Sequence, residues 1–542
     1  MEVQTTNKNN IEDENNDNKT DSPASFEEAI SATGFGKYNY YLLFVICFPC
    51  LTNVFNNADL SFILSAAQCD LNLTLEDKGI LNGVMFAGMV SSGLIWGFLC
   101  DAFGRKNILV YGYFTSGVFG LIAAMSANKN VLIAAKFLSG VVINGPFSAS
   151  TAHIAEFHST NYRSIVNTTR GIFLSLASLI MPVLAWAILP RTWNISVFGL
   201  FELHSWNFFL IVCSLTTVVS GIFYIFLPES PKYLMSTGRN KQALLVMQRV
   251  YALNTGKSGE EFPVRKLHEE VARRSLSGQI TIKDTLIHEL KEFKKIFHHP
   301  YLLSVALVVF NDFTLMSSVN TLKLWLPSIF QSVSDYKYIH NGTTSSVCDM
   351  LQMIQPQNVS TSTSETCIVA EDSLSVYVNT FIAAFTRILA FSISTPFVKW
   401  MGVKTLNICC CFLTTIFNVA IYFAYDETTI TTLSSVGTAI GSVAGNLLLS
   451  LTLEMFPTTL RTIAISLHYT FGRAGTLMGN IIFPHLINAG CFPPFLFIGI
   501  SSLGKKKRKF LNLVNIADIL CCFYKLFFML QLARWVHFCI PA

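Results

Sequence analysis

Charged residues are scarce in this chain of 542 residues. Only 13% of them are Asp, Glu, Lys or Arg, whereas an ordinary soluble domain carries about 25%. This deficit excludes a soluble globule, because too little charge remains to cover its surface. Proline, with 17 residues, is too sparse for a collagen-like fibre, and the positive mean hydropathy excludes a disordered chain. A basic nucleic-acid-binding domain is excluded too, since 38 basic residues nearly balance 33 acidic ones.

Long apolar runs take the place of charge, and 51% of the residues are hydrophobic. Runs of about 20 residues, enough for one helix to cross a bilayer, recur at about 38–66, 79–100, 108–127, 131–155, 166–189 and 206–227. After a hydrophilic interval, five more follow at about 301–330, 373–398, 405–424, 429–453 and 462–485. A twelfth begins near Phe492. The sequence therefore predicts an all-α integral membrane protein.

The runs divide the chain into five expected segments. They are an acidic cytosolic tail over 1–37, a first helical bundle over 38–228, a central cytosolic loop over 229–300, a second bundle over 301–503 and an atypical tail over 504–542. The N-terminal tail lacks the basic start and short apolar core of a cleaved secretion signal, and we expect it to be flexible.

Basic residues and glycosylation sequons agree on one orientation. If the N-terminal tail is cytosolic, the short cytosolic loops receive Arg105, Lys106, Arg163, Lys399, Lys404 and Arg461. The opposite loops hold few Lys or Arg residues, as the positive-inside rule requires. The same topology places four N-glycosylation acceptors outside the cytosol: Asn72, Asn194, Asn341 and Asn358. We therefore expect a cytosolic N-terminus, in a plasma membrane or a secretory or synaptic vesicle membrane.

The two long loops have distinct patterns. In the central loop, apolar residues such as Leu244, Met247 and Tyr251 share a helical face, which favours either a helix on the membrane surface or a linker packed under the bundles. The outer loop over 331–372 contains Cys348 and Cys367, although most of the 14 cysteines fall inside apolar runs. In an oxidising compartment these two thiols are candidates for a disulfide, but spacing alone does not show that they meet.

A charged motif lies between the second and third runs, reading Gly97-Phe-Leu-Cys-Asp101-Ala-Phe-Gly104-Arg105-Lys106. Gly97 permits close helix contact and Gly104 a tight turn, while Asp101 can pair with Arg105 or with a neighbouring helix end. An ion pair at a moving interface in water stabilises one conformation and is broken at little cost, so the cluster suits a transporter latch. The alternative is an ordinary charged loop that only sets orientation.

This motif resembles the loop signature of the major facilitator superfamily, G-x-x-x-D-x-x-G-R-K. Three further segments support the resemblance. Glu156 and Arg163 stand seven residues apart at a predicted cytosolic helix end, and Glu454 and Arg461 repeat that arrangement in the second half. The stretch Pro228-Glu229-Ser230-Pro231 is similar to a signature of the sugar-porter and organic-ion branches. The segment after Met235, with Phe262-Pro-Val, is most similar to synaptic vesicle glycoprotein 2 and its relatives.

The resemblance implies two six-helix bundles around a site near the bilayer midplane, with alternating access by rocking of one bundle against the other. Polar residues inside the runs are then candidates for the binding site, because ionisable groups at membrane depth cost several kcal/mol unless they face the interior or water. The expected cavity residues are Asn53, Asn56, Asp59, Asp312, Trp325, Arg387 and Arg473. For each of them the alternative is a hydrogen bond that only joins two helices.

The chain departs from the resemblance at three places. Asn53 and Asn56 occupy the positions of two acidic residues in the vesicle glycoproteins, so proton coupling through the first run is doubtful unless Asp59 substitutes. The second copy of the loop signature has Lys399 and Val403 in place of Asp and Arg, which predicts a weaker latch. The last apolar run ends at about Leu503, after about half a membrane thickness, and we hypothesise that an alternative or misread transcript supplies residues 504–542.

Two functions follow from these observations. The first is a secondary transporter of a small organic solute, an organic ion or a sugar-like molecule, with the lipid bilayer and a coupling ion as further partners. The second is a transport-inactive scaffold or regulator of vesicles, which the amides Asn53 and Asn56 and the short last helix favour. We find no ATP-binding loop, no metal-ligand cluster and no nucleophile with a paired base, so neither enzyme activity nor a cofactor is expected. A nucleic-acid partner is not expected either, and the predicted state is a monomer.

Overall fold

The computed structural model describes residues 23–197, 201–268, 296–298, 301–351, 374–456 and 458–501. The expectations for Asn358, for Cys367 and for the tail over 504–542 lie outside these ranges.

Six long helices form the first half of the chain. They are α3 (Lys37–Ala66), α4 (Leu75–Phe103), α5 (Arg105–Ala124), α6 (Lys129–Glu156), α7 (Thr160–Ile188) and α8 (Ser205–Ile225). Polar residues fix their starts: the Thr74 hydroxyl accepts from the Asp77 N–H before α4, and the Asn128 side chain accepts from the Asn130 N–H before α6. Each helix overlaps one of the predicted apolar runs.

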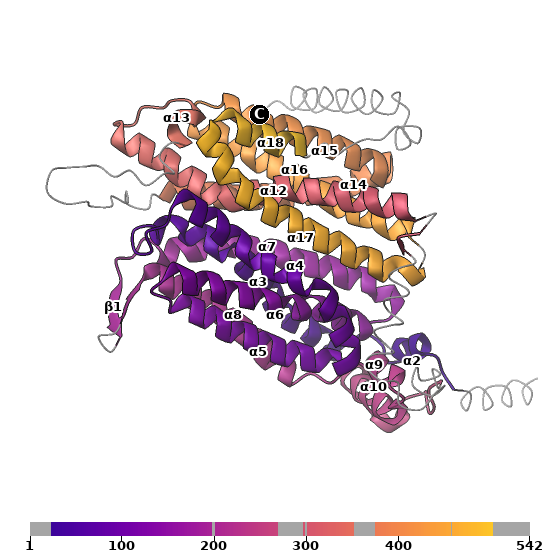
Figure 1. The fold of residues 1–542 in the computed structure, drawn as a ribbon. Helices are drawn as coiled ribbons and strands as arrows, with labels where there is room; N and C mark the ends of the chain where they lie inside the picture. The colour runs from indigo at the N-terminus through magenta and orange to yellow at the C-terminus, as the bar shows by residue number, and fades with distance from the viewer. Residues whose placement is uncertain are drawn as a thin grey trace, which may run out of the picture.

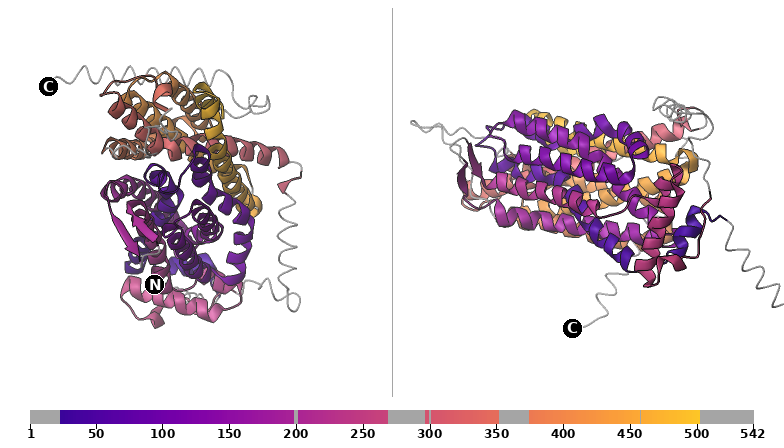
Figure 2. Two further views of the ribbon diagram at one scale, coloured as in Figure 1. Left: turned by 60° about the vertical axis from the view of Figure 1, so that its left-hand side comes forward. Right: turned by 90° about the horizontal axis from the view of Figure 1, so that it is seen from below.

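The second half repeats this pattern. It comprises α12 (Leu302–Ile339), α13 (Val347–Leu351), α14 (Leu374–Met401), α15 (Val403–Ala420), a 3₁₀ turn (Ile421–Phe423), α16 (Glu427–Met455), α17 (Thr458–Ala489) and α18 (Phe492–Ser501). Figures 1 and 2 show the two halves lying against each other, with the first in indigo to magenta and the second in salmon pink through orange to yellow. Among the described residues, nine helices are long and apolar enough to cross a membrane. The predicted all-α membrane fold is confirmed.

The connections between helices collect at two opposite ends of the molecule. One end carries the hairpin of β1 (Asn194–Val197) and β2 (Phe201–His204), together with α13 (Figure 1). Three predicted sequon residues, Asn72, Asn194 and Asn341, are exposed in loops or strands at this end, which we call the sequon end. The other end carries the small helices α2, α9 and α10, and we call it the α10 end.

The small helices at the α10 end pack into a cluster of their own. They are α2 (Phe26–Ala32), α9 (Pro231–Ser236) and α10 (Asn240–Thr255). Phe26 and Ile30 of α2 are buried with Met247 of α10, so the expectation of a flexible tail over 1–37 is wrong for the part that forms α2. Apolar residues at helical spacing and a capping box between Ser25 and Glu28 explain this helix.

The apolar face predicted in the central loop contacts protein. Met247 and Val250 of α10 are buried, and Leu244 and Tyr251 pack onto the cluster with α2. The Asn254 amide at the end of α10 donates to the Gly34 carbonyl at 3.0 Å and accepts from the Tyr38 N–H at 3.0 Å. Because these contacts join α10 to the start of α3, the structure favours the alternative in which this loop packs under the bundles.

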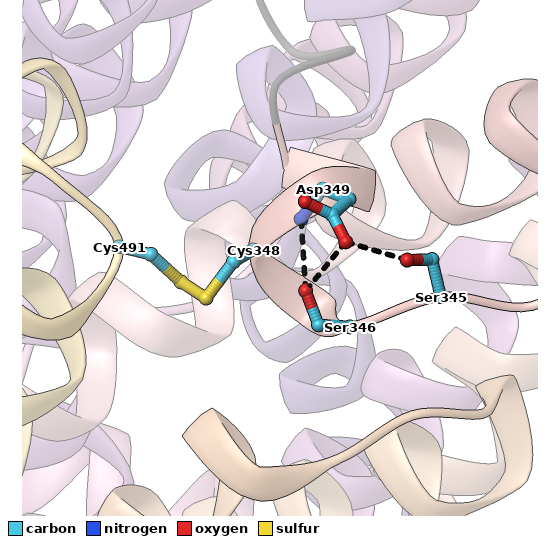
Figure 3. Close-up of a disulfide and its surroundings, with 5 residues drawn as sticks. All are labelled: Ser345, Ser346, Cys348, Asp349 and Cys491. Carbon is cyan, nitrogen blue, oxygen red and sulfur yellow. Dashed lines mark hydrogen bonds between the residues drawn. A yellow bond between two sulfur atoms is a disulfide. The ribbon is translucent and has the colours of Figure 1, made fainter.

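A disulfide joins two connections at the sequon end. Cys348 of α13 is bonded to Cys491, which lies between α17 and α18 (Figure 3). The candidate pairing of Cys348 with Cys367 is therefore wrong. Proximity in sequence favoured Cys367, but buried Val347 and Met350 seat α13 on the core of the second half, beside the turn that carries Cys491. Figure 3 also shows Asp349 accepting hydrogen bonds from Ser345 and Ser346 at the start of α13.

Peptide mapping without reductant should recover a peptide containing Cys348 linked to one containing Cys491. The double variant Cys348→Ser/Cys491→Ser is expected to lose about 2–4 kcal/mol of stability, because the bond closes a long loop in the unfolded chain. Unfolding of the purified protein in detergent measures this loss, and Cys47→Ser, which removes a free thiol, is the control. Recovery of both peptides as free thiols from non-reduced protein would contradict the pairing.

Candidate substrate cavity and gate

A cavity of about 370 Å³ lies between the two halves of the protein. Helices α3, α4 and α6 of the first half and α12, α14, α16 and α17 of the second half contribute its walls. The residues that give the cavity its polar character are Asn53, Asn57, Asp312, Asn320, Ser442, Asn446, His468, Tyr469, Arg473 and Thr476. Apolar side chains, among them Phe86, Met89 and Phe147, complete the lining. A mixed lining of this kind is typical of small-molecule sites.

Asp312 of α12 and His468 of α17 form the acidic side of the cavity. The Asp312 carboxylate lies 3.6 Å from the His468 ring, and both side chains are almost fully buried from solvent. Gly472 lets the two helices approach, because a Cβ at this position would collide with the Asp312 carboxylate. One oxygen of Asp312 and the Nδ1 atom of His468 have no hydrogen-bond partner. Buried polar atoms without partners are costly, so these two atoms are candidates for contact with a solute.

Arg473 connects the two halves across the cavity. Its guanidinium donates to the side-chain oxygen of Asn144 in α6, and it lies 6.0 Å from the centre of the Tyr469 ring. The Asn144 amide in turn donates to the Met89 carbonyl of α4 at 3.0 Å. The second half thus contributes a carboxylate, Asp312 of α12, and a cation, Arg473 of α17, to the cavity. Of these two groups, only Arg473 is hydrogen-bonded to the first half.

The structure separates the amides of α3 by the direction in which they point. Asn53 lines the cavity together with Asn57, which donates to the Asn53 side-chain oxygen at 3.0 Å. Asn56 lines neither described cavity, because its amide donates to the Thr217 hydroxyl of α8 at 2.9 Å. For Asn56 the helix-joining alternative is the correct one. Asn57 was missed, although it lies one helical turn after Asn53.

Asp59 does not face the cavity. Its carboxylate forms an ion pair with the Lys136 ammonium of α6 inside the first bundle, where the two side chains are 1% and 0% exposed. The prediction that Asp59 lines the cavity is therefore wrong. Lys136 sits near the start of a predicted span, and nothing in the local sequence marks it as the partner of Asp59.

Two further candidates also lie elsewhere. The Trp325 indole donates to the Asn480 side chain at 3.1 Å and packs against Phe483, with ring centres 5.0 Å apart, so Trp325 is a core residue. Arg387 lines a second and smaller cavity together with Lys323. Asp312 and Arg473 are thus the two predicted charged residues that the main cavity contains. Within the described ranges, no group of His, Cys, Asp or Glu side chains could hold a metal ion.

At the α10 end, Glu229 caps the first turn of α5. Its carboxylate accepts from the backbone N–H groups of Arg105 at 3.0 Å and Lys106 at 3.1 Å. A carboxylate at this place also interacts favourably with the positive end of the helix dipole. Gly104, the residue before α5, has a φ of +87°, and a Cβ there would lie 2.4 Å from Glu229 if the backbone did not move. Two separate motifs of the sequence, the loop signature and the Pro-Glu-Ser-Pro stretch, therefore meet at one helix end.

Arg105 extends this cluster to α6. Its Nε atom lies 3.5 Å from the Glu156 carboxylate, which also accepts from the Ser230 hydroxyl at 2.5 Å. The guanidinium lies 5.4 Å from the centre of the Tyr233 ring. We call Gly104, Arg105, Glu156 and Glu229 the charge cluster. It joins three connections of the first half at the α10 end.

The remaining gate candidates are placed as follows. Arg163 at the start of α7 pairs with Glu27 of α2, with 2.6 Å between nitrogen and oxygen, and not with Glu156. Glu454 near the end of α16 is exposed, so the second copy of the Glu/Arg arrangement differs from the first. Gly97 and Asp101 lie in α4 and Arg461 lies in α17, and their side chains are outside the described part of the structure.

The halves meet closely at the sequon end. Leu75, at the start of α4, is buried in the core of the second half, and Glu76 lies 3.7 Å from His485 of α17. Along α4, a Cβ on Gly79 would lie 2.6 Å from Pro484, and one on Gly93 would lie 2.9 Å from the Thr470 hydroxyl. We call this glycine-lined contact the α4–α17 seam. Toward the sequon end, α3 also packs on α12, whereas α6 and α16 are not packed against each other over the described residues.

The sequence profile of the major facilitator superfamily matches residues 43–364, more than half of the chain. The chain belongs to the major facilitator superfamily. Proteins of this superfamily are transporters and not enzymes. Among curated relatives, synaptic vesicle glycoprotein 2B of Rattus norvegicus is 25% identical over 329 residues, which cover 58% of this chain and 48% of that protein. Synaptic vesicle glycoprotein 2C of Mus musculus is 24% identical over 344 residues, covering 60% of this chain and 47% of that protein.

This superfamily member thus spans about half the length of the curated relatives it matches. Solved structures show the same fold. The inward-open form of the xylose transporter XylE from E. coli aligns with a TM-score of 0.59 at 15% identity and covers 86% of this chain and 94% of that one. A bacterial homologue of the human lysosomal transporter Spinster aligns with a TM-score of 0.56 at 12% identity, covering 84% of each chain. The two-bundle fold implied by the resemblance is confirmed.

Proposed function

We propose that this multi-pass membrane protein is a secondary active or facilitative transporter that moves a small organic solute by alternating access. The observation that carries the proposal is the mixed polar cavity between the halves, next to a tight contact at the sequon end. A solute at this place would touch both halves, so its binding energy can depend on how the halves are arranged. The tight contact of Leu75 and Gly79 with the second half closes the route toward the sequon end.

The charge cluster would keep the first half together while it moves. It holds α5, α6 and α9 together at the α10 end of the first half, so this half can move as one body. The exposed Glu454 provides no matching ion pair in the second half over the described residues. In this scheme the α10 end faces the cytosol and the sequon end faces outward, as the basic residues of the short loops and the exposed Asn72 and Asn341 support.

The lining of the cavity supports a solute with polar groups of both kinds. Asp312 and its unpaired oxygen suit a cationic or hydroxyl donor, while Arg473 suits an anionic or carbonyl acceptor. The amides of Asn53, Asn57 and Asn320 add neutral donors and acceptors. An organic ion or a sugar-like molecule fits this set. The solved relative XylE is a xylose transporter, which favours the sugar-like alternative.

Uptake of a panel of sugars, organic cations and organic anions into proteoliposomes tests the proposal. The wild-type chain should take up at least one class, and Asp312→Asn should reduce that uptake about tenfold or more, because a hydrogen bond to a charged group contributes about 1.5–3 kcal/mol. Glu202→Gln, on the exposed strand β2, should leave uptake unchanged. If the folded wild-type protein took up no member of the panel, transport would be the wrong function.

The alternative proposal is that this chain, which resembles the vesicle glycoproteins, is a transport-inactive membrane scaffold or regulator. The specific observation in its favour is that α3 carries the neutral residues Asn53 and Asn56, and that its Asp59 is held by Lys136. None of these three groups is a free carboxylate in the cavity. In that case Arg473 would serve only to hold the two halves in one arrangement, and Asp312 would only join α12 to α17 within the second half.

A further inference from the structure

Two membrane-embedded cations face a small cavity that is separate from the main one. Lys323 of α12 and Arg387 of α14 both line a cavity of about 50 Å³, which shares no lining residue with the larger cavity. Both side chains line the same cavity, so their positive charges repel each other. No acidic side chain lines this cavity, and neither cation has an ion pair within the described part of the chain. The buried Nε atom of Arg387 has no hydrogen-bond partner.

Two unpaired cations at this depth are costly. A charged side chain inside the membrane normally pairs with an opposite charge or faces water, and an uncompensated buried charge is strongly destabilising. The three hydroxyl groups in the wall, on Ser61, Ser178 and Thr380, donate their hydrogens to carbonyls of their own helices, so their oxygens are neutral acceptors and bring no negative charge to the two cations. The remaining wall is apolar, including Val54 and Met181 of the first half. Over the described residues, the lining therefore carries two positive charges and no negative charge.

We propose that this cavity is a binding site for a small inorganic anion of the size of chloride, held by Lys323 and the Nε–H of Arg387. The cavity has a volume of about 50 Å³, and a single water needs about 10–15 Å³ of such space. The cavity therefore admits a monatomic anion with a few waters. A sugar-sized or other organic solute does not fit, which separates this site from the main cavity. The apolar wall lowers the local dielectric and strengthens the attraction between the anion and both cations.

The site also bridges the two halves. Its cations come from α12 and α14 of the second half, whereas α3 and α7 of the first half close it from the other side. An anion held there would favour the arrangement in which these four helices surround it, and it would be released when they separate. This consequence adds to the proposed function, but binding of the anion itself does not depend on whether the chain transports a solute.

Chloride binding to the intact chain in lipid nanodiscs tests the site directly. Chloride is titrated against gluconate at constant ionic strength, with binding of radiolabelled chloride and the unfolding temperature as readouts. The wild-type protein should bind chloride saturably and unfold at a higher temperature as chloride rises. Lys323→Gln and Arg387→Gln should each weaken binding about tenfold or more, since each removes a charged donor. Lys399→Gln, which neutralises an exposed cation on the same helix α14, should leave binding unchanged.

The unfolding temperature of the Arg387 variant provides a second test. Without chloride, Arg387→Gln should unfold at a higher temperature than the wild type, because it removes the repulsion between two cations that line the same cavity. A merely structural role for Arg387 would give the opposite sign. The proposal is overturned if the wild type shows no saturable chloride binding, if Arg387→Gln binds chloride as tightly as the wild type, or if acetate binds at these residues and chloride does not.

Discussion

Gly104→Ala is expected to destabilise the protein about twice as much as Gly402→Ala. Both glycines precede the third helix of their half, and both have the same rare backbone conformation, with φ, ψ of 87°, 158° at Gly104 and 79°, 154° at Gly402. A residue with a Cβ in this region costs about 1–3 kcal/mol of strain at either position. The two sites differ in their surroundings, since a Cβ at Gly402 meets no atom within 4 Å.

At Gly104 the added Cβ would also displace Glu229 from the first turn of α5. Losing hydrogen bonds from two backbone donors to a carboxylate adds about 1.5–3 kcal/mol to the strain. Unfolding in detergent measures both variants, and the double variant Gly104→Ala/Glu229→Ala isolates the coupling. In the Glu229→Ala background, alanine at 104 should cost only the strain that Gly402→Ala costs. Equal losses for the two single variants would mean that the contact with Glu229 contributes nothing.

Lys136→Met is expected to cost about 3–5 kcal/mol, because it leaves the Asp59 carboxylate buried without its partner. The pair is almost completely buried within the first bundle, at 0% and 1% exposure, so water cannot replace the lost ammonium. The double variant Asp59→Leu/Lys136→Met should recover most of this loss, since a buried ion pair contributes little compared with apolar residues of similar volume. Unfolding temperature and the yield of folded protein measure these changes.

Lys129→Met is the matched control for that prediction. Lys129 is the first residue of α6 and pairs with Asp77 at 2.7 Å, but its side chain is 34% exposed. An ion pair with access to water contributes about 1 kcal/mol or less, so this variant should be nearly neutral. If Lys136→Met were equally mild, Asp59 would have another source of compensation, and the ion pair would not be what holds α3 to α6.

The positions of the helices could be predicted from the sequence, because a membrane span depends mainly on the length and composition of one run. The expected runs and the observed helices overlap at each of the twelve places where the structure has a long helix or α18. The loop signature and the Pro-Glu-Ser-Pro stretch could also be recognised, since both are local. The contact between these two motifs at the first turn of α5 could not be predicted, because Glu229 and Gly104 are far apart in the sequence and meet only in the tertiary structure.

The side of a helix on which each residue contacts its neighbours was harder to predict. Helix α3 is apolar almost all round, so its sequence does not show which side faces the cavity and which faces α6 or α8. In the structure, Asn57 lines the cavity, whereas Asn56 is hydrogen-bonded to α8 and Asp59 forms an ion pair with α6. The predicted disulfide was wrong for a related reason. Cys348 and Cys491 are 143 residues apart, and local spacing favoured Cys367 instead. Long-range pairing is a property of the tertiary structure.

The α4–α17 seam has a mechanical consequence for a protein made of two moving bodies. At Gly79, Gly83 and Gly93 no side chain stands between the backbone of α4 and helix α17, so the two helices pack closely along this line. Displacement is smallest near a rotation axis and grows with distance from it. If the two halves rock against each other as proposed, this close contact would act as the pivot, and the largest excursions would occur at helices that do not pack on it, such as α8 and α15. Under the proposed alternating access, the spacing of three glycines along one helix would therefore set where the two halves move least against each other.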